Sequence, residues 1–164
     1  MKIILASTSP YRKELLERLQ IPFTSRNPEV DETLLKKEIS NPEDLAIGLA
    51  ELKAKNAIKN ESEITIGSDQ VLNLEGEILG KPGNREKAIE QLLKMQGKEH
   101  TLITAVCVTD SLKTKTFISK AHMKMRRLDK DAITRYVERD TPFNCAGSYK
   151  LESLGISLFE SINV

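Results

Sequence analysis

The sequence has few cysteines, almost no net charge and no long apolar run, and each shortage excludes a class of protein. Two cysteines in 164 residues, Cys107 and Cys145, are too few for a disulfide framework or a cysteine-rich metal site. With 25 Lys and Arg against 24 Asp and Glu, the chain has no net field to concentrate a nucleic-acid polymer or an acidic membrane. Apolar stretches such as residues 102–108 are far shorter than the roughly 18 residues of a membrane span.

The amino terminus also lacks a secretory signal, because the apolar block at residues 3–6 is too short and the polar segment 7–10 follows at once. We therefore expect a cytoplasmic protein with reduced thiols. The length suits one domain with its own core, and no repeat or flexible linker interrupts it. A basic cluster at residues 120–130 has no interleaved aromatic residues, so a charged strand edge explains it better than nucleic-acid binding.

Capping residues and apolar periodicity predict an alternation of helices and strands. Helices are expected after Ser9, Asn41, Asn84 and Asp129, each of which is a good N-cap residue. Leucines 15, 16 and 19 are expected to form the apolar stripe of the first helix. Strands are expected at residues 2–6, 64–66, 71–74, 77–79, 102–109, 114–125 and 156–162. This mixture predicts an α/β fold around a mixed sheet.

The familiar nucleophilic and phosphate-binding motifs are missing. His100 and His122 lie in predicted strands without a neighbouring Ser or Cys motif, and Ser148 lacks the glycine pattern of a nucleophile elbow. Lys81 follows a glycine, but Pro82 stands where a Walker loop needs Ser or Thr. Covalent catalysis and a P-loop are both disfavoured.

The segment from Ser7 to Arg12 lies between a predicted buried strand and a helix. Free backbone N–H groups at the helix start, three hydroxyls and the Arg12 guanidinium can together bind a phosphate chain. The alternative is ordinary capping by Ser9 with a solvated Arg12, and the spacing alone does not decide between them.

Two acidic segments offer oxygen ligands for a metal. Residues 29–32 hold three carboxylates, and residues 67–70 are expected to interrupt a strand with polar groups around Asp69. Since Mg²⁺ needs only one or two carboxylates besides phosphate oxygens and water, Glu32 and Asp69 suffice if the fold brings them together. Lys53 and Lys81 could reach a phosphate; for each of these residues, a plain surface position is the competing interpretation.

Taken together and in order, these segments resemble the Maf family of nucleoside triphosphate pyrophosphatases. The resemblance covers six segments with the family's order and spacing, at residues 5–12, 29–33, 49–54, 66–71, 80–82 and 145–150. It implies a single elongated α/β domain over residues 1–164, with a mixed β-sheet flanked by helices and a central cleft, as in Maf and ITPase-like proteins. It also implies cleavage of a nucleotide between the α and β phosphates with a divalent metal, Mg²⁺ or Mn²⁺.

The resemblance assigns roles residue by residue. It implies a catalytic role for Asp69 and shared metal binding by Glu32 and Asp69. It implies phosphate binding by Ser7, Arg12, Lys53 and Lys81.

The resemblance also implies that Tyr11, Gln70 and Glu152 select the base of the nucleotide. Tyr11 stands where the dTTP and UTP pyrophosphatases of the family have arginine, so the chain resembles the 7-methyl-GTP branch. The partner is then a small-molecule nucleotide, with no nucleic-acid polymer and no membrane, and the family suggests a homodimer. The chain ends at Val164, before the family's usual Gly-Asp and Val-Gly-Leu-Pro stretches, so the domain is expected to lack that C-terminal segment.

Two alternatives stay open. The same chemistry could act on dTTP, UTP or a modified nucleotide. The cleft could instead sense a nucleotide without turnover, as a regulator of cell division, although a pure binder would need the lysines more than the carboxylates.

Overall fold

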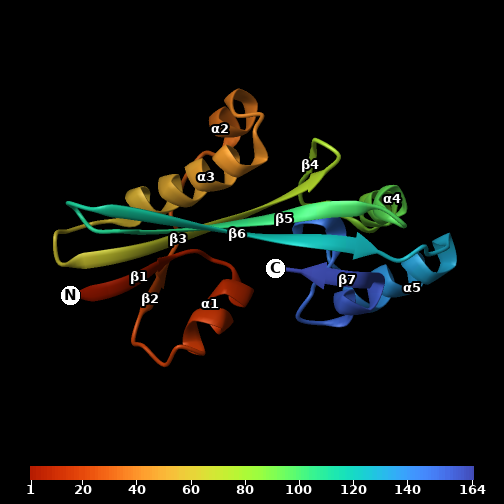
Figure 1. Cartoon of the computed structure of the whole chain (residues 1–164). Helices are drawn as coiled ribbons and strands as arrows, with labels where there is room; N and C mark the ends of the chain where they lie inside the picture. The colour runs from red at the N-terminus through yellow and green to blue at the C-terminus, as the bar shows by residue number, and fades with distance from the viewer. The chain divides into compact units, whose positions relative to one another are not determined.

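The computed structural model describes residues 1–164 and contains a seven-stranded mixed sheet (Figure 1). The strand order is β2-β1-β3-β5-β6-β7, and β4 pairs with β3. Strand β1 pairs in parallel with β2 on one side and with β3 on the other. The pairs β3 with β4 and β6 with β7 are antiparallel. The predicted α/β fold with a mixed sheet flanked by helices is confirmed.

The bounds of the elements are as follows. The strands are β1 Lys2–Ala6, β2 Thr24–Arg26, β3 Glu63–Leu74, β4 Glu77–Leu79, β5 Glu99–Thr109, β6 Thr114–Met125 and β7 Phe159–Asn163. The helices are α1 Pro10–Glu17, α2 Thr33–Glu38, α3 Pro42–Ala57, α4 Arg85–Met95 and α5 Lys130–Asp140, with 3-10 turns η1 Ala146–Ser148 and η2 Leu154–Leu158. No helix is both long and apolar enough to cross a bilayer.

The predicted helix starts are confirmed by their caps. The side chains of Ser9, Asn41, Asn84 and Asp129 each accept a hydrogen bond from a backbone N–H in the first turn of the helix that follows. These N–H groups have no partner within their own helix, so a side-chain oxygen fixes where each helix begins. Helix α2 and strand β2 were not predicted, because both are too short to show a periodic pattern.

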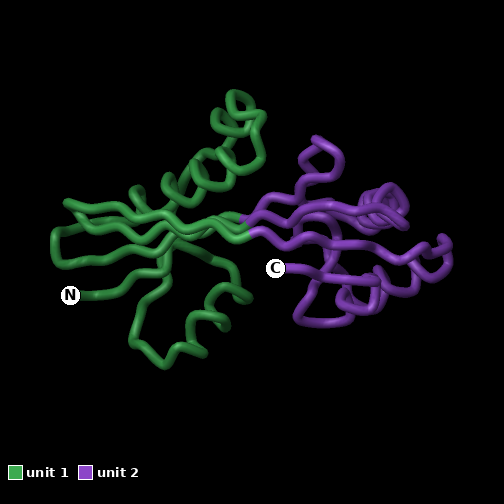
Figure 2. The backbone as a smooth tube through the Cα atoms, viewed as in Figure 1, with its two compact units in different colours: residues 1–69, 104–119 green, residues 70–103, 120–164 purple.

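The chain divides into two compact units, which Figure 2 distinguishes by colour. Unit 1 comprises residues 1–69 and 104–119, and unit 2 comprises residues 70–103 and 120–164. Strands β3, β5 and β6 each contribute residues to both units.

The core of unit 1 lies between α3 and the parallel strands. Leu45, Leu49 and the alanines of α3 are buried, as are Ile4 and Leu5 of β1. Helices α2 and α3 lie on one side of these strands and α1 lies on the other (Figure 1).

The predicted leucine stripe of α1 is wrong as a core face. No residue of α1 is buried, Leu15 is 47% exposed and Leu16 is half-buried. The helix ends at Glu17, so Leu19, which is 65% exposed, falls outside it. The apolar face that this unit buries comes from α3 instead.

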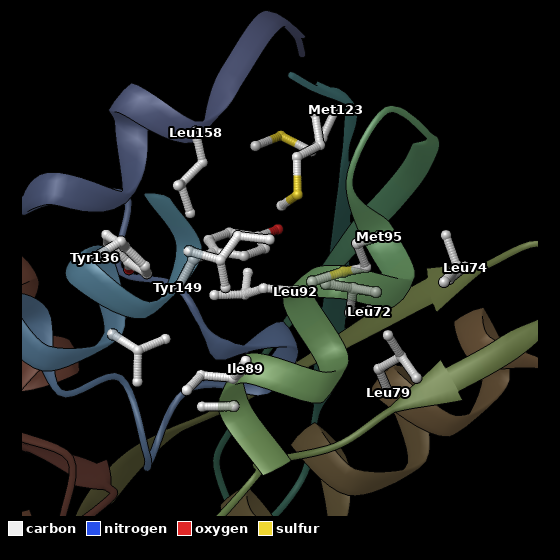
Figure 3. Packing of buried hydrophobic residues seen from close by; sticks show 14 of the residues in the cluster. Leu72, Leu74, Leu79, Ile89, Leu92, Met95, Met123, Tyr136, Tyr149 and Leu158 are labelled. Atoms are coloured by element: carbon white, nitrogen blue, oxygen red, sulfur yellow. The ribbon is translucent and has the colours of Figure 1, made fainter. Parts of the chain in front are cut away.

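The core of unit 2 is built around α4, as Figure 3 shows. Ile89, Leu92 and Met95 of this helix belong to a cluster that includes Tyr149 and Met123. The predicted strand at residues 156–162 is only partly right, because the 3-10 turn η2 occupies residues up to Leu158 and β7 begins at Phe159.

A buried histidine in unit 2 predicts how stability depends on pH. His100 on β5 is 4% exposed, lies against the rings of Tyr149 and Phe159, and shares a 3.0 Å hydrogen bond with the Tyr149 hydroxyl. Its Nδ1 has no partner. Burial lowers the pKa of His100 to about 4, because the apolar surroundings disfavour the charged ring.

We therefore expect the free energy of unfolding to fall as the pH drops from about 6.5 to about 4. In this window the unfolded histidine binds a proton and the folded one does not, so protonation favours unfolding by up to about 3 kcal/mol. Urea unfolding at several pH values between 7 and 4.5 measures this loss of unfolding free energy. Glu63 changes the stability mainly at lower pH than His100, because its hydrogen bond from Arg26 lowers the pKa of Glu63 to about 2.

The matched comparison is His100→Gln against His122→Gln. The first variant should flatten the slope of stability with pH, while the second, at an exposed position of β6, should keep the parental slope. Equal slopes in all three proteins would mean that His100 is not the titrating group.

Candidate active site

Three predicted site residues of unit 1 lie beyond one edge of its parallel strands: Ser7 follows β1, Glu32 comes after β2, and Asp69 lies farther along β3. Leu5 of β1 pairs with Ile66 of β3, and Ala6 pairs with Arg26 of β2. Strands β1 and β2 end at that level, whereas β3 continues. Ser7, Glu32 and Asp69 are therefore all placed beyond the same edge of these parallel strands. Ligands commonly bind at this edge in α/β sheets.

Strand β3 runs without a break through residues 67–70, so the prediction that this polar segment interrupts a strand is wrong. The strand continues because Gly67 lets α3 pack directly on it. A Cβ at Gly67 would lie 2.2 Å from the Ala50 carbonyl oxygen and 2.6 Å from the Ala54 nitrogen. Only a hydrogen atom fits there, so the backbones approach closely two residues before Asp69.

This close packing brings Lys53 of α3 onto two carboxylates. The Lys53 Nζ lies 2.5 Å from Asp69 Oδ1 and 2.8 Å from Glu32 Oε1. The side chains of Lys53, Asp69 and Glu32 are 10%, 13% and 27% exposed. The three groups are thus mostly buried and make their contacts with one another, which is how a protein accommodates charge away from water.

The loop that carries Glu32 is held by α3. The Asn56 side-chain amide donates a 2.5 Å hydrogen bond to the Pro28 carbonyl, and Asp31 Oδ1 accepts one from the Thr33 N–H at the start of α2. Of the three predicted carboxylates in residues 29–32, only Glu32 reaches Lys53.

Glu32 is strongly held in its ionised form. Burial by itself raises the pKa of Glu32, but hydrogen bonds from Lys36 and Lys53, together with their charges, lower it to about 2. Since Lys36 lies one helical turn after Glu32, the Glu-Lys spacing of four residues is a signal that identifies this contact from the sequence. Lys36, Gly67 and Asn56 were not among the predicted residues.

The segment after β1 forms a compact turn. Ser7 is 6% exposed, and its hydroxyl accepts from the Ser9 N–H at 3.1 Å. Ser9 in turn caps α1 by accepting from the Arg12 N–H. Capping, the alternative interpretation for this segment, therefore describes Ser9, while Arg12 is half-buried in the first turn and Tyr11 is 37% exposed.

Three predicted residues belong to unit 2. Gln70 continues β3 immediately after Asp69, Lys81 lies in the loop between β4 and α4, and Glu152 follows η1. All three side chains are exposed.

The donor set in unit 1 fits a magnesium-like ion. Glu32 and Asp69 offer hard carboxylate oxygens that meet at one point, the Lys53 ammonium. No group of three or more His, Cys, Asp or Glu side chains comes together in a way that could hold a metal. Two carboxylates are too few for a closed zinc or calcium site, but they suffice where phosphate oxygens and water supply the other ligands.

Comparisons with known proteins identify a family and several relatives. A family model described as Maf-like protein matches residues 2–164. A 7-methyl-GTP pyrophosphatase of Bdellovibrio bacteriovorus is 47% identical over 98% of this chain and 85% of its own length. Proteins with the same name from Vibrio vulnificus and Aromatoleum aromaticum are 44% and 45% identical, over 98% and 99% of this chain and 83% and 84% of theirs.

A solved structure supports the fold. The Staphylococcus aureus Ham1 protein superposes with a TM-score of 0.53 at 20% identity, covering 94% of this chain and 90% of its own. At this identity the likeness bears on the fold alone.

Proposed function

The chain belongs to the Maf family, and from this premise we propose that it is a nucleoside triphosphate pyrophosphatase that hydrolyses 7-methyl-GTP to 7-methyl-GMP and pyrophosphate. The observation that carries the proposal is that relatives 43–47% identical over nearly the whole chain share the name 7-methyl-GTP pyrophosphatase. The shared name also favours 7-methyl-GTP over the dTTP and UTP alternatives. The contact of Glu32 and Asp69 with Lys53 supports turnover rather than mere binding, because a nucleotide sensor needs cations more than carboxylates.

Metal dependence is part of the proposal. Glu32 and Asp69 are the residues that hold Mg²⁺ or Mn²⁺, and the ion supplies positive charge to the phosphate oxygens when bound. Both carboxylates are partly buried, which limits the competition of bulk water for the ion.

The reaction is attack of water on the α phosphorus. Asp69 positions the water and accepts its proton as the new oxygen–phosphorus bond forms, and the bond between the α phosphorus and the bridging oxygen breaks. Pyrophosphate leaves with the electron pair of that bond. No covalent enzyme intermediate is required.

The cations of the chain stabilise the charge that moves onto the leaving group. Lys53, Arg12 and Lys81 contact the phosphate chain, and Ser7 offers a hydroxyl beside the start of α1. Preformed positive groups of this kind usually make the largest single contribution to catalysis of phosphoryl transfer. The substrate is a small nucleotide, and we propose the cytoplasm as the place of action. The homodimer stays a prediction.

The test is a panel of nucleoside triphosphates with Mg²⁺ or Mn²⁺ present. We expect stoichiometric release of pyrophosphate and the nucleoside monophosphate, with 7-methyl-GTP the best substrate, and we expect a chelator to abolish release and added metal to restore it. Release of orthophosphate alone would contradict the reaction type. Turnover that a chelator leaves unchanged would contradict the metal.

A further inference from the structure

Ser148 in unit 2 has a conformation that the chain adopts at a cost. The residue is completely buried and has φ +64°, in the left-handed region that residues other than glycine rarely occupy. Gly147 before it has φ +74°, and a Cβ there would lie 2.2 Å from Leu72 Cδ1. Strain at a buried polar residue persists only where surrounding contacts demand it, and such positions gather at functional sites.

The hydroxyl of Ser148 is the first member of a hydrogen-bond relay. Ser148 Oγ donates to Gln91 Oε1 at 2.5 Å, and Gln91 Nε2 donates to the Gly80 carbonyl oxygen at 3.1 Å. The Gly147 N–H donates to the same carbonyl at 3.4 Å. Both ends of the Gln91 amide are therefore used: its oxygen accepts from Ser148, and its nitrogen donates to the carbonyl of the peptide group that leads directly into Lys81.

The other end of the Lys81 loop is also fixed. The Gly83 N–H donates to the Phe143 carbonyl at 3.0 Å. Pro82, which lies between Lys81 and Gly83 in the chain, is buried. The Lys81 side chain itself is exposed. A lysine side chain is long and flexible, so the backbone of its loop is the part of the molecule that can define where the ammonium starts from.

We propose that Gln91 and Ser148 are positioning residues that hold the loop of residues 80–83, and through it the Lys81 ammonium, for the phosphate chain. The proposal rests on the proposed function, because it takes Lys81 as a phosphate ligand. Gly147 and Ser148 belong to the same segment as Glu152, so the relay also joins the loop of the phosphate ligand to the segment proposed to read the base.

The first experiment compares Ser148→Ala with Ser148→Gly. Alanine removes the hydroxyl but keeps the strained φ, whereas glycine removes the hydroxyl and relieves the strain. Both variants should lose about fivefold to tenfold in kcat/KM, which corresponds to the free energy of one lost hydrogen bond. The glycine variant should unfold at a higher urea concentration than the alanine variant. Gln91→Leu should match their loss in kcat/KM, and Ser157→Ala, whose hydroxyl donates to Leu154, should be parental.

The second experiment asks whether Ser148 acts through Lys81. In a Lys81→Met background, Ser148→Ala should lower kcat/KM no further, because the group it positions is gone. An additive loss in the double variant would overturn the proposal, since a general structural defect does not depend on Lys81. Restored activity in Ser148→Gly would also overturn it, because the hydroxyl would then be dispensable.

The third experiment does not depend on turnover. Affinity for inorganic tripolyphosphate, measured by calorimetry, should show the same pattern in the two single variants and the double variant. The Gly83 amide should exchange its hydrogen faster in Ser148→Ala and Gln91→Leu than in the parent. A parent that binds tripolyphosphate with this pattern but releases no pyrophosphate would refute the proposed function and keep the relay, whereas unchanged affinity and exchange would refute the relay.

Discussion

Replacing Asp69 with Asn is expected to reduce single-turnover hydrolysis of 7-methyl-GTP by about 10²-fold to 10⁴-fold, the range typical of a lost general base. The change keeps the shape of the side chain but removes its charge and its basicity. Lys53 also contacts Glu32, at 2.8 Å in the parent, so the ammonium should stay paired in this variant and the local fold should persist. Nucleotide binding should therefore survive better than the rate, and rapid mixing of excess enzyme with substrate measures the two separately.

The matched control for this variant is Asp110→Asn. Asp110 also belongs to unit 1, but its carboxylate accepts from the Leu112 and Lys113 N–H groups in the turn between β5 and β6. Its loss should alter stability and leave the rate of hydrolysis near that of the parent. If Asp69→Asn turned over as fast as Asp110→Asn, Asp69 would have no part in proton transfer or metal binding.

The second large effect concerns the base. We expect the parent to prefer 7-methyl-GTP over UTP by roughly 30-fold to a few thousand-fold in kcat/KM. The methylated guanine ring is a cation, and a cation over an aromatic face such as Tyr11 gains about 0.5 to 2 kcal/mol. A carboxylate at Glu152 that accepts two adjacent N–H groups of guanine adds about 1.5 to 3 kcal/mol. Together these contributions reach about 2 to 5 kcal/mol if they are realised in the transition state.

Two pairs of variants test base selection. Tyr11→Arg should collapse the preference, since arginine repels the cationic ring, whereas Tyr11→Phe keeps an aromatic face and should retain most of it. Glu152→Ala should lower the preference further than Glu152→Gln. Both residues are exposed, so neither change disturbs a core. An unchanged ranking of 7-methyl-GTP, GTP and UTP in all four variants would mean that other residues read the base.

The elements that the sequence predicted well are those specified by neighbouring residues. A cap such as Asn41 acts on N–H groups two and three residues ahead, and the alternation in residues 102–109 reflects the two faces of one strand. Short elements without such patterns, α2 and β2, escaped prediction. The family resemblance likewise follows from segments that are each contiguous in the chain.

The predicted leucine stripe of the first helix does not form a core face, because periodicity shows which side chains are apolar, and not whether another element covers them. Leu15 and Leu19 have the spacing of a helix stripe, yet they are exposed because α3 supplies the buried face of unit 1. The polar residues 67–70 were likewise read as a break in a strand. Packing of α3 on Gly67 keeps that strand continuous, and this contact involves residues 13 and 17 positions earlier in the chain.

The sequence alone determined which residues could carry the chemistry, since carboxylates, lysines and hydroxyls are recognisable wherever they stand. Only the tertiary structure decided which of them meet. Lys53 joins Glu32 and Asp69 because a parallel register and a glycine contact align α3 with β3, and Gln91 reaches Ser148 across 57 positions of chain. Such contacts depend on the packing of distant segments against one another, and a local pattern holds no information about that packing.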